Sequence, residues 1–186
     1  MRTALFLFSF LLFLSSCGDK NTDADKNAPP AADTVKQVRK NKDELALLLP
    51  KELLGYKPKK APEGLDMVMK NARFSFSILT YFKDNDSICV ELHDYLDGEP
   101  AYENYADMWW FSKKQADDAT IKAGPLDMGA GIDAWEVDHR DEKRTTVYLG
   151  VRDRYYLIFE AYNKPDLRFI ESVVKQFDFE PLLHGK

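Results

Sequence analysis

Alternation of apolar and polar side chains is the clearest pattern in the middle and C-terminal parts of the chain. Apolar residues alternate with polar ones over 74–82 and again over 88–93, and the polar turn 84–86 lies between them. A period of two is typical of a half-buried strand, so two such segments joined by a short turn predict an antiparallel hairpin. We expect further strands over residues 65–69, 132–139, 145–151 and 155–162.

Apolar residues at helical spacing are clearest near the C-terminus. Pro165 suits the first position of a helix, and the residues after it repeat at intervals of three and four. This spacing puts the apolar residues on one face of a C-terminal helix. The residues on this face are Leu167, Ile170, Val173, Val174 and Phe177.

Two more helices are expected nearer the N-terminus. Asp33-Thr34 can cap a helix that ends at Leu49, because Pro50 disfavours helical backbone in the residue before it. Pro100 fits the first position of a middle helix over residues 101–115.

The order of elements predicts an α+β domain over residues 33–186. Short turns join consecutive strands, so the sheet should be mostly antiparallel, with about five to six strands packed with N-terminal, middle and C-terminal helices. This layout is similar to the fold shared by the PsbP and Mog1 families. The Leu-Pro and Gly-Tyr pairs before the first strand, with the terminal hairpin and helix, also resemble uncharacterised bacterial envelope proteins. Both resemblances rest on element order, and they imply no functional residue.

A short apolar segment lies at the start of the chain. Arg2 is followed by the uncharged run from Ala4 to Leu14, which as a helix would extend about 16 Å. The hydrocarbon core of a bilayer is about 30 Å thick, so this run is too short to span it. A basic start and a short apolar stretch are typical of a secretory signal peptide, which we place at residues 1–16.

The residues around Cys17 indicate how this signal is processed. Bulky Leu14 disfavours an ordinary signal peptidase site, which needs small residues at both positions. Leu14-Ser15-Ser16-Cys17 resembles the lipobox of bacterial lipoproteins, in which an aliphatic and two small residues precede a cysteine. The resemblance implies cleavage before Cys17 and attachment of acyl chains such as palmitate, which would hold the protein at a membrane. The alternative is an ordinary secreted protein in which Cys17 is incidental.

The segment 17–32, which begins with this cysteine, is predicted to be a lipidated tether. Residues 18–32 contain no aromatic and no large aliphatic side chain, so they cannot offset the entropy of ordering and should be disordered. Gly18 stands where enteric lipoproteins retained at the inner membrane carry an aspartate, so the resemblance favours the outer membrane. Asp19 and Asp23 are also compatible with export to the cell surface, and the periplasmic and surface sides both stay open.

Composition limits the classes of partner that the domain is expected to bind. The 186 residues are 45% hydrophobic, and 26 Lys and Arg against 31 Asp and Glu give a formal net charge of −5. A nucleic-acid partner needs a basic face, so this balance argues against one. If Cys17 is lipidated, Cys89 is the only thiol left, and no disulfide can form within the chain.

Candidate residues for catalysis or metal binding are few. Glu91 and His93 share a strand face and, with His139 on another strand, could approach a metal ion; the alternative is polar side chains on a half-exposed sheet. Cys89 is expected to be a structural thiol, since His93 lies about 13 Å away along the same face. No metal-ligand spacing and no nucleophile motif occurs, so we expect no catalytic residue, metal, cofactor or enzymatic activity.

Two loop motifs have simpler interpretations than ligand binding. Asp84-Asn85-Asp86 begins like a calcium loop, but Ile88 stands where another ligand is needed, so a turn is expected. Gly129-Ala130-Gly131 precedes a strand and not a helix, which predicts a loop and not a phosphate cradle.

The middle helix contains three consecutive large aromatic residues. Trp109, Trp110 and Phe111 cannot all face one narrow core, because successive helical residues are about 100° apart. Large exposed aromatic residues mark interaction surfaces, so these three form a candidate surface. The alternative is a helix that is buried over a wide arc.

Three functional hypotheses follow from these observations. The first is a lipid-anchored, non-catalytic protein of the cell envelope whose domain binds another envelope protein. The second is an envelope protein that binds an apolar ligand or lipid on the sheet face beneath the aromatic helix. The third is a metal-dependent enzyme built on Glu91, His93 and His139. The oligomeric state and the identity of the partner stay open.

Overall fold

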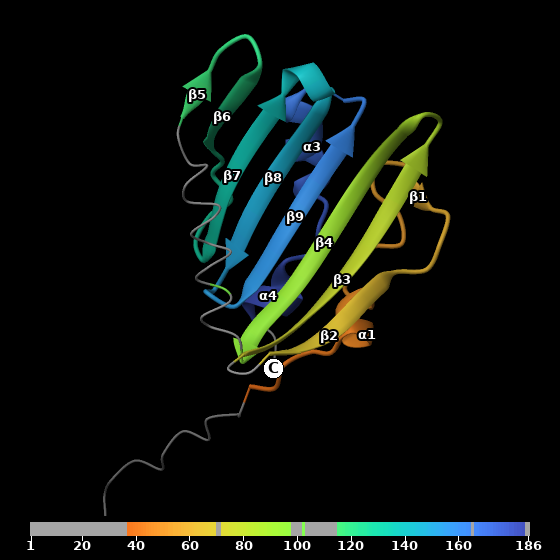
Figure 1. The fold of residues 1–186 in the computed structure, drawn as a ribbon, viewed down its shortest axis with the longest axis vertical. Coiled ribbons are helices and arrows are strands. Elements are labelled where there is room, and N and C mark those ends of the chain that lie inside the picture. The colour runs from red at the N-terminus through yellow and green to blue at the C-terminus, as the bar shows by residue number, and fades with distance from the viewer. Residues whose placement is uncertain (1–36, 70–71, 98–101, 103–114, 165, 185–186) are drawn as a thin grey trace, which may run out of the picture. The chain divides into compact units, whose positions relative to one another are not determined.

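The computed structural model describes residues 37–69, 72–97, 102, 115–164 and 166–184 (Figure 1). The predicted signal peptide, the predicted tether and nearly all of the predicted middle helix lie outside these residues. Among the helices that the structure describes, none combines the length and the apolar character that a membrane crossing requires.

A single antiparallel sheet contains the nine strands found within the described residues. Its spatial order is β1-β3-β4-β9-β8-β7-β6-β5, and β2 pairs with the same edge of β3 as β1 does. The strands are β1 (Lys57–Pro58), β2 (Glu63–Met69), β3 (Ala72–Lys83), β4 (Asp86–Asp97), β5 (Ala116–Asp117), β6 (Ile121–Pro125), β7 (Ile132–His139), β8 (Arg144–Val151) and β9 (Tyr155–Tyr162).

The mostly antiparallel sheet predicted from the alternating pattern is confirmed, but the expected five to six strands were too few. The additional strands are short or lack alternation: β1 and β5 have two residues each, and β6 ends in Gly124 and Pro125. Such segments become strands because neighbouring strands supply hydrogen bonds, which is information that a local pattern does not contain.

The first described helix is shorter than predicted. Helix α1 spans Lys42–Ala46, and the Asn41 side chain caps it by accepting hydrogen bonds from the backbone N–H groups of Asp43 and Glu44. The Glu44 carboxylate accepts from the backbone N–H of Asn41, which completes a capping box. The predicted start at Asp33-Thr34 was therefore wrong for this helix, because the capping box fixes its beginning eight residues later.

Two helices and a 3₁₀ turn follow later in the chain. Helix α3 spans Leu167–Val174, with Asp166 as its N-cap, and its buried residues Ile170, Val173 and Val174 confirm the predicted helical face. A short helix α4, Glu180–Leu183, which was not predicted, adds buried Leu182, and the 3₁₀ turn η1, Arg140–Glu142, connects β7 to β8.

The main hydrophobic core lies between the sheet and the helices. Figure 1 shows α1, α3 and α4 behind the sheet, and their buried side chains join one cluster with those of the central strands. We call this side of the sheet the helix-covered face. From β4 and β9 it takes the completely buried side chains of Ile88, Val90, Leu92, Leu157 and Phe159.

A buried ion pair closes one end of this core. Arg154 donates from Nε and Nη2 to the two carboxylate oxygens of Asp94, at 2.9 and 2.6 Å, and the Asp94 side chain is completely buried. The backbone N–H groups of Lys40 and Leu96 also donate to this carboxylate, at 2.8 and 3.0 Å. The pair thereby holds the segment before α1 against β4 and the β8–β9 turn.

Candidate functional site

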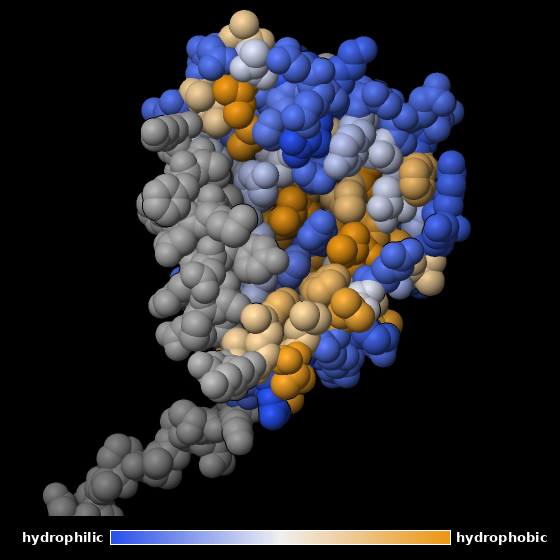
Figure 2. All heavy atoms as spheres, in the orientation of Figure 1, coloured by the Kyte–Doolittle hydropathy of each residue, from blue (hydrophilic) through white to orange (hydrophobic). Residues whose placement is uncertain are grey.

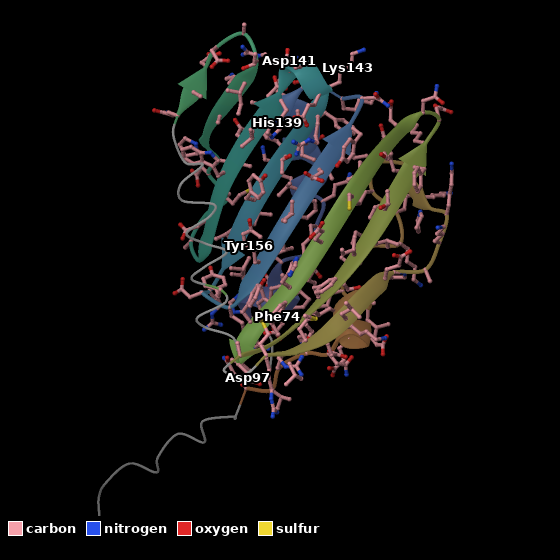
Figure 3. All side chains as sticks on the ribbon, viewed as in Figure 1. Phe74, Asp97, His139, Asp141, Lys143 and Tyr156 are labelled. Atoms are coloured by element: carbon pink, nitrogen blue, oxygen red, sulfur yellow. The ribbon has the colours of Figure 1, made fainter. Side chains whose placement is uncertain are left out.

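The opposite side of the sheet carries a second hydrophobic cluster, which is rich in aromatic rings. We call this side the aromatic face; Figure 3 labels two of its residues, Phe74 and Tyr156, and Figure 2 shows apolar side chains gathered over its middle and lower parts, with polar side chains around the rim. The buried members of the cluster are Phe74, Tyr95, Ala123, Trp135, Val137 and Tyr156, and partly buried neighbours include Met67, Phe76, Tyr102, Tyr148 and Ile158.

Strand register places the side chains of this face in rows across the sheet. In one row Phe76, His93 and Tyr156 are successive partners on β3, β4 and β9. Because residues directly opposite each other on one face have neighbouring side chains, the register brings three rings together. The adjacent row consists of Ile78, Glu91, Ile158, Tyr148 and Trp135.

His93 lies at the centre of these contacts. Its ring stacks on Phe76 with centroids 5.4 Å apart and on Tyr95 at 5.8 Å, and Tyr156 meets it edge-on at 6.0 Å. Along β4, the Glu91 carboxylate lies 3.3 Å from His93 Nε2, and the Tyr95 hydroxyl lies 3.5 Å from Nδ1. The prediction that Glu91 and His93 share a face is confirmed.

The Glu91 carboxylate and the Tyr95 hydroxyl lie on opposite sides of the His93 imidazole and favour one orientation of the ring. A carboxylate can only accept, so in the neutral ring Nε2 carries the hydrogen and Nδ1 accepts from the Tyr95 hydroxyl. Aromatic rings pack on both sides, and His93 is only 5% exposed. The arrangement holds a polar group at a fixed position within a mostly apolar surface, which is a means of giving that surface specificity.

A cluster of charged side chains lies at the upper end of the same face. Arg144 Nη1 donates to Glu160 at 2.8 Å and its Nε donates to Glu142 at 2.8 Å, while the Tyr162 hydroxyl donates to Glu160 at 2.9 Å. His139 is the register partner of Arg144. Burial, and secondarily the Arg144 guanidinium, lower the pKa of His139.

The structure separates the residues of the metal-site hypothesis. His139 lies on β7, and β8 and β9 stand between it and β4, which makes about 14 Å across three strand spacings. Figure 3 shows His139 near the upper end of the sheet, well above Tyr156, the register partner of His93. Among the residues that the structure describes, no three His, Cys, Asp or Glu side chains are placed to hold a metal ion.

Cys89 faces away from the main core. Its neighbours Ile88 and Val90 point to the helix-covered face, whereas Cys89 lies opposite Thr80 and Glu160 on the aromatic face. Burial raises the pKa of the Cys89 thiol to about 11. A thiol with a raised pKa has little thiolate at neutral pH, so this setting fits the predicted structural role.

The two loop motifs have structural roles. Asp86 accepts from Lys164 Nζ at 2.7 Å, and the backbone C=O of Asn85 accepts from Asn163 at 2.8 Å, so the predicted turn joins β3–β4 to the end of β9. Gly129 and Gly131 both have positive φ angles in the loop before β7, as expected for a turn.

Both predicted functional segments lie outside the described residues: Cys17, and the aromatic surface Trp109, Trp110 and Phe111. Tyr102, at the start of the predicted middle helix, is described and contacts the aromatic face. Its ring meets Tyr95 edge-on, with centroids 5.9 Å apart, and burial raises its pKa to about 12. A Cβ atom at Gly150 would lie 2.8 Å from the Tyr102 hydroxyl oxygen, so this glycine makes room for the ring.

Two features of this face were missed from the sequence. Trp135 is 8% exposed, and its indole Nε1 has no hydrogen-bond partner within the described residues; the alternation over 132–139 could have placed it beside Val137. The second is an exposed apolar surface on β2 and β3, which we call the β2–β3 patch. It consists of Leu65, Met67, Met69, Phe76 and Ile78.

Comparisons with protein families, with curated proteins and with solved structures give no match to this chain. Its function must therefore be argued from its own residues.

Proposed function

We propose that this chain is a lipid-anchored protein of the bacterial cell envelope, in the outer membrane, whose domain binds another envelope protein and catalyses no reaction. In this proposal Cys17 carries the acyl chains and residues 18–32 form the tether. The β2–β3 patch on the aromatic face is the part of the domain that meets the partner.

The observation that carries the binding role is the exposure of apolar side chains on β2. Six large hydrophobic residues are exposed among those described, and two of them, Leu65 and Met69, lie on the aromatic face of this one strand, whereas a third, Val68, points to the other side of the sheet. Leu65 and Met69 are each 55% exposed, and Leu65 lies opposite partly exposed Phe76. Contiguous exposed apolar surface is typical of an interaction site, because water-exposed apolar area favours association.

The polar groups at the margin of the aromatic face favour a protein, among the possible kinds of partner. Charged and hydrogen-bonding groups such as Arg144, Glu142 and Glu160 lie at the margin of the apolar centre. An apolar centre with a polar rim is the usual composition of a protein–protein interface.

The anchor is tested by the mature N-terminus. Mass spectrometry of the protein from membranes should give a chain that starts at Cys17 and carries acyl chains. A Cys17→Ser variant should lose its sedimentation with membranes, because two or three acyl chains provide the attachment. An uncut Met1, or unchanged sedimentation of the variant, would contradict the anchor, and separation of inner from outer membranes would test the location.

The binding surface is tested by photocrosslinking in intact cells. Benzoylphenylalanine in place of Leu65 should give one adduct with an envelope protein identified by mass spectrometry, and the same adduct should form with that protein once purified. Leu47, 85% exposed next to α1, is the matched control position. Equal adducts at both positions, or none at Leu65, would contradict the proposal for the patch and leave the result for the anchor unaffected.

A further inference from the structure

A gap in strand pairing occurs at the edge of the sheet. The pairing of β1 with β3 ends at Pro58 and Tyr81, and that of β2 begins at Glu63 and Ile78. Leu79 and Thr80 therefore have no strand partner on this edge among the described strands. Alternate residues of an antiparallel strand direct their N–H and C=O to alternate sides, so one of these two presents an unpaired N–H and C=O here.

A hollow of about 280 Å³ lies at this gap. We call it the edge hollow; its main lining residues are Lys59, Lys60, Glu63, Ile78, Thr80 and Phe82. Ile78 and Phe82 provide apolar walls, and Lys59 Nζ lies 4.6 Å from the centroid of the Phe82 ring.

The charge of the edge hollow is opposite to that of the chain. Two ammonium groups and one carboxylate, that of Glu63, line it, whereas the whole chain has a formal net charge of −5. The nearby Lys57 is paired with Glu52 at 3.4 Å, but neither Lys59 nor Lys60 forms an ion pair within the described residues. Two unpaired cations beside an apolar wall favour a ligand that has an anionic end and an apolar end.

We propose that the edge hollow binds a carboxylate with a single aliphatic chain. The carboxylate lies between Lys59 and Lys60, where the unpaired backbone N–H of β3 can also donate to it. The aliphatic chain lies on Ile78 and Phe82 and extends toward the β2–β3 patch, where it removes apolar surface from water. This inference goes beyond the proposed function and does not depend on the lipid anchor or on a protein partner.

Photoaffinity labelling of the full-length protein in lipid nanodiscs tests the site. The probe is decanoic acid with a diazirine in its chain, and the labelled residues are identified by mass spectrometry. We expect labels on segments 59–63 and 78–82, reduced by excess decanoate but much less by decanol or decyltrimethylammonium. Labels elsewhere on the domain, or equal competition by decanol, would overturn the proposal, because an anion would then not be selected.

A pair of double variants tests the two lysines. Lys59→Gln/Lys60→Gln should lower labelling of the edge hollow about three- to tenfold, as expected for two exposed ion pairs. Lys122→Gln/Lys175→Gln removes the same charge from two exposed lysines elsewhere and should leave labelling unchanged. Equal labelling in both double variants would overturn the proposal, and circular dichroism of each variant shows whether the fold is retained.

Discussion

The helix-covered face and the aromatic face use the same strands but are filled by different side chains. From β4 the helix-covered face takes Ile88, Val90 and Leu92, all completely buried, whereas the aromatic face takes Cys89, Glu91 and His93. The first face is apolar, with many aliphatic side chains and some rings such as Phe159 and Phe177, and it is covered by α1, α3 and α4; the second mixes rings, a histidine and charged groups. The first buries more apolar side chains, so we expect it to contribute most of the stability.

One ion pair from each face can be compared, and the two pairs differ in burial. Asp94, on the helix-covered side, has no exposed side-chain surface, and its partner Arg154 has 11%. Arg144 and Glu160, on the aromatic side, keep 18% and 20% of theirs. Breaking a pair costs more where the remaining charge cannot reach water, so the comparison can be tested directly.

Removal of the buried carboxylate should have the largest effect. Asp94→Ala leaves Arg154 charged without its partner and two backbone N–H groups without an acceptor, so we expect a loss of about 3–5 kcal/mol in the free energy of unfolding. Glu160→Ala should cost about 1 kcal/mol, because Arg144 keeps Glu142. Urea unfolding followed by circular dichroism measures both. Similar losses in the two variants would mean that the faces do not differ in this way.

Substitution of two consecutive residues of β9 should give the next largest difference in stability. Leu157 is completely buried against the helices, and Ile158 is partly exposed on the aromatic face. Leu157→Ala should cost about 2–5 kcal/mol because it leaves a cavity in a closed core, whereas Ile158→Ala should cost about 1 kcal/mol. The midpoints of urea unfolding test this. A loss for Ile158→Ala as large as that for Leu157→Ala would show a second closed core on the aromatic face.

The contact between Gly150 and Tyr102 should give a smaller effect that is not additive. Gly150→Ala places a methyl group 2.8 Å from the Tyr102 hydroxyl oxygen, which must move, at a cost of about 1 kcal/mol. In a Tyr102→Phe background that oxygen is absent, and the nearest ring carbon lies at 3.9 Å, an ordinary contact. The double-mutant cycle should show that the second substitution relieves the first. Purely additive losses would mean that Tyr102 does not occupy the space at Gly150.

The sequence predicted most of the long strands because their apolar side chains are buried in the sheet and leave a recognisable local pattern. The segment 132–139 coincides with β7, and 155–162 coincides with β9. The start of α1 was wrong although the Asn41 and Glu44 capping box is visible in the sequence, because Asp33-Thr34 offered a competing cap. Local signals of equal strength cannot be ranked without the tertiary contacts that select one of them.

The candidate site was predictable only along a single strand. That Glu91 and His93 share a face follows from their spacing of two residues, whereas His139 could not be placed relative to them because the order of strands is not a local property. For the same reason the ion pair of Asp94 and Arg154 could not be predicted. The two residues are far apart in the chain and meet because β4 lies beside β9.

The smallest expected effect is a dependence of stability on pH through His139. Burial, and then Arg144, lower the pKa of His139 in the folded state, while the unfolded value is about 6.5. As the pH falls below about 6.5, the unfolded chain binds a proton that the folded chain does not, so stability decreases until the folded pKa is passed. Burial raises the pKa of Glu136 in the folded state, so protonation of this carboxylate at lower pH stabilises the folded chain and opposes the effect of His139. The quantity to measure is therefore the difference in pH dependence between the original chain and a His139 variant.

Urea unfolding of the original chain and of His139→Gln at pH 7.5 and pH 5.5 isolates this contribution. The substitution should make stability less dependent on pH, because it removes a side chain that is charged in the unfolded state and disfavoured as a cation in the folded one. His184→Gln, at an exposed position directly after α4, is the matched control for removal of a histidine. If His139→Gln and His184→Gln change the pH dependence equally, the upper end of the aromatic face does not disfavour a cation at His139. The contrast in charge environment between the two faces would then rest on the ion pairs compared above.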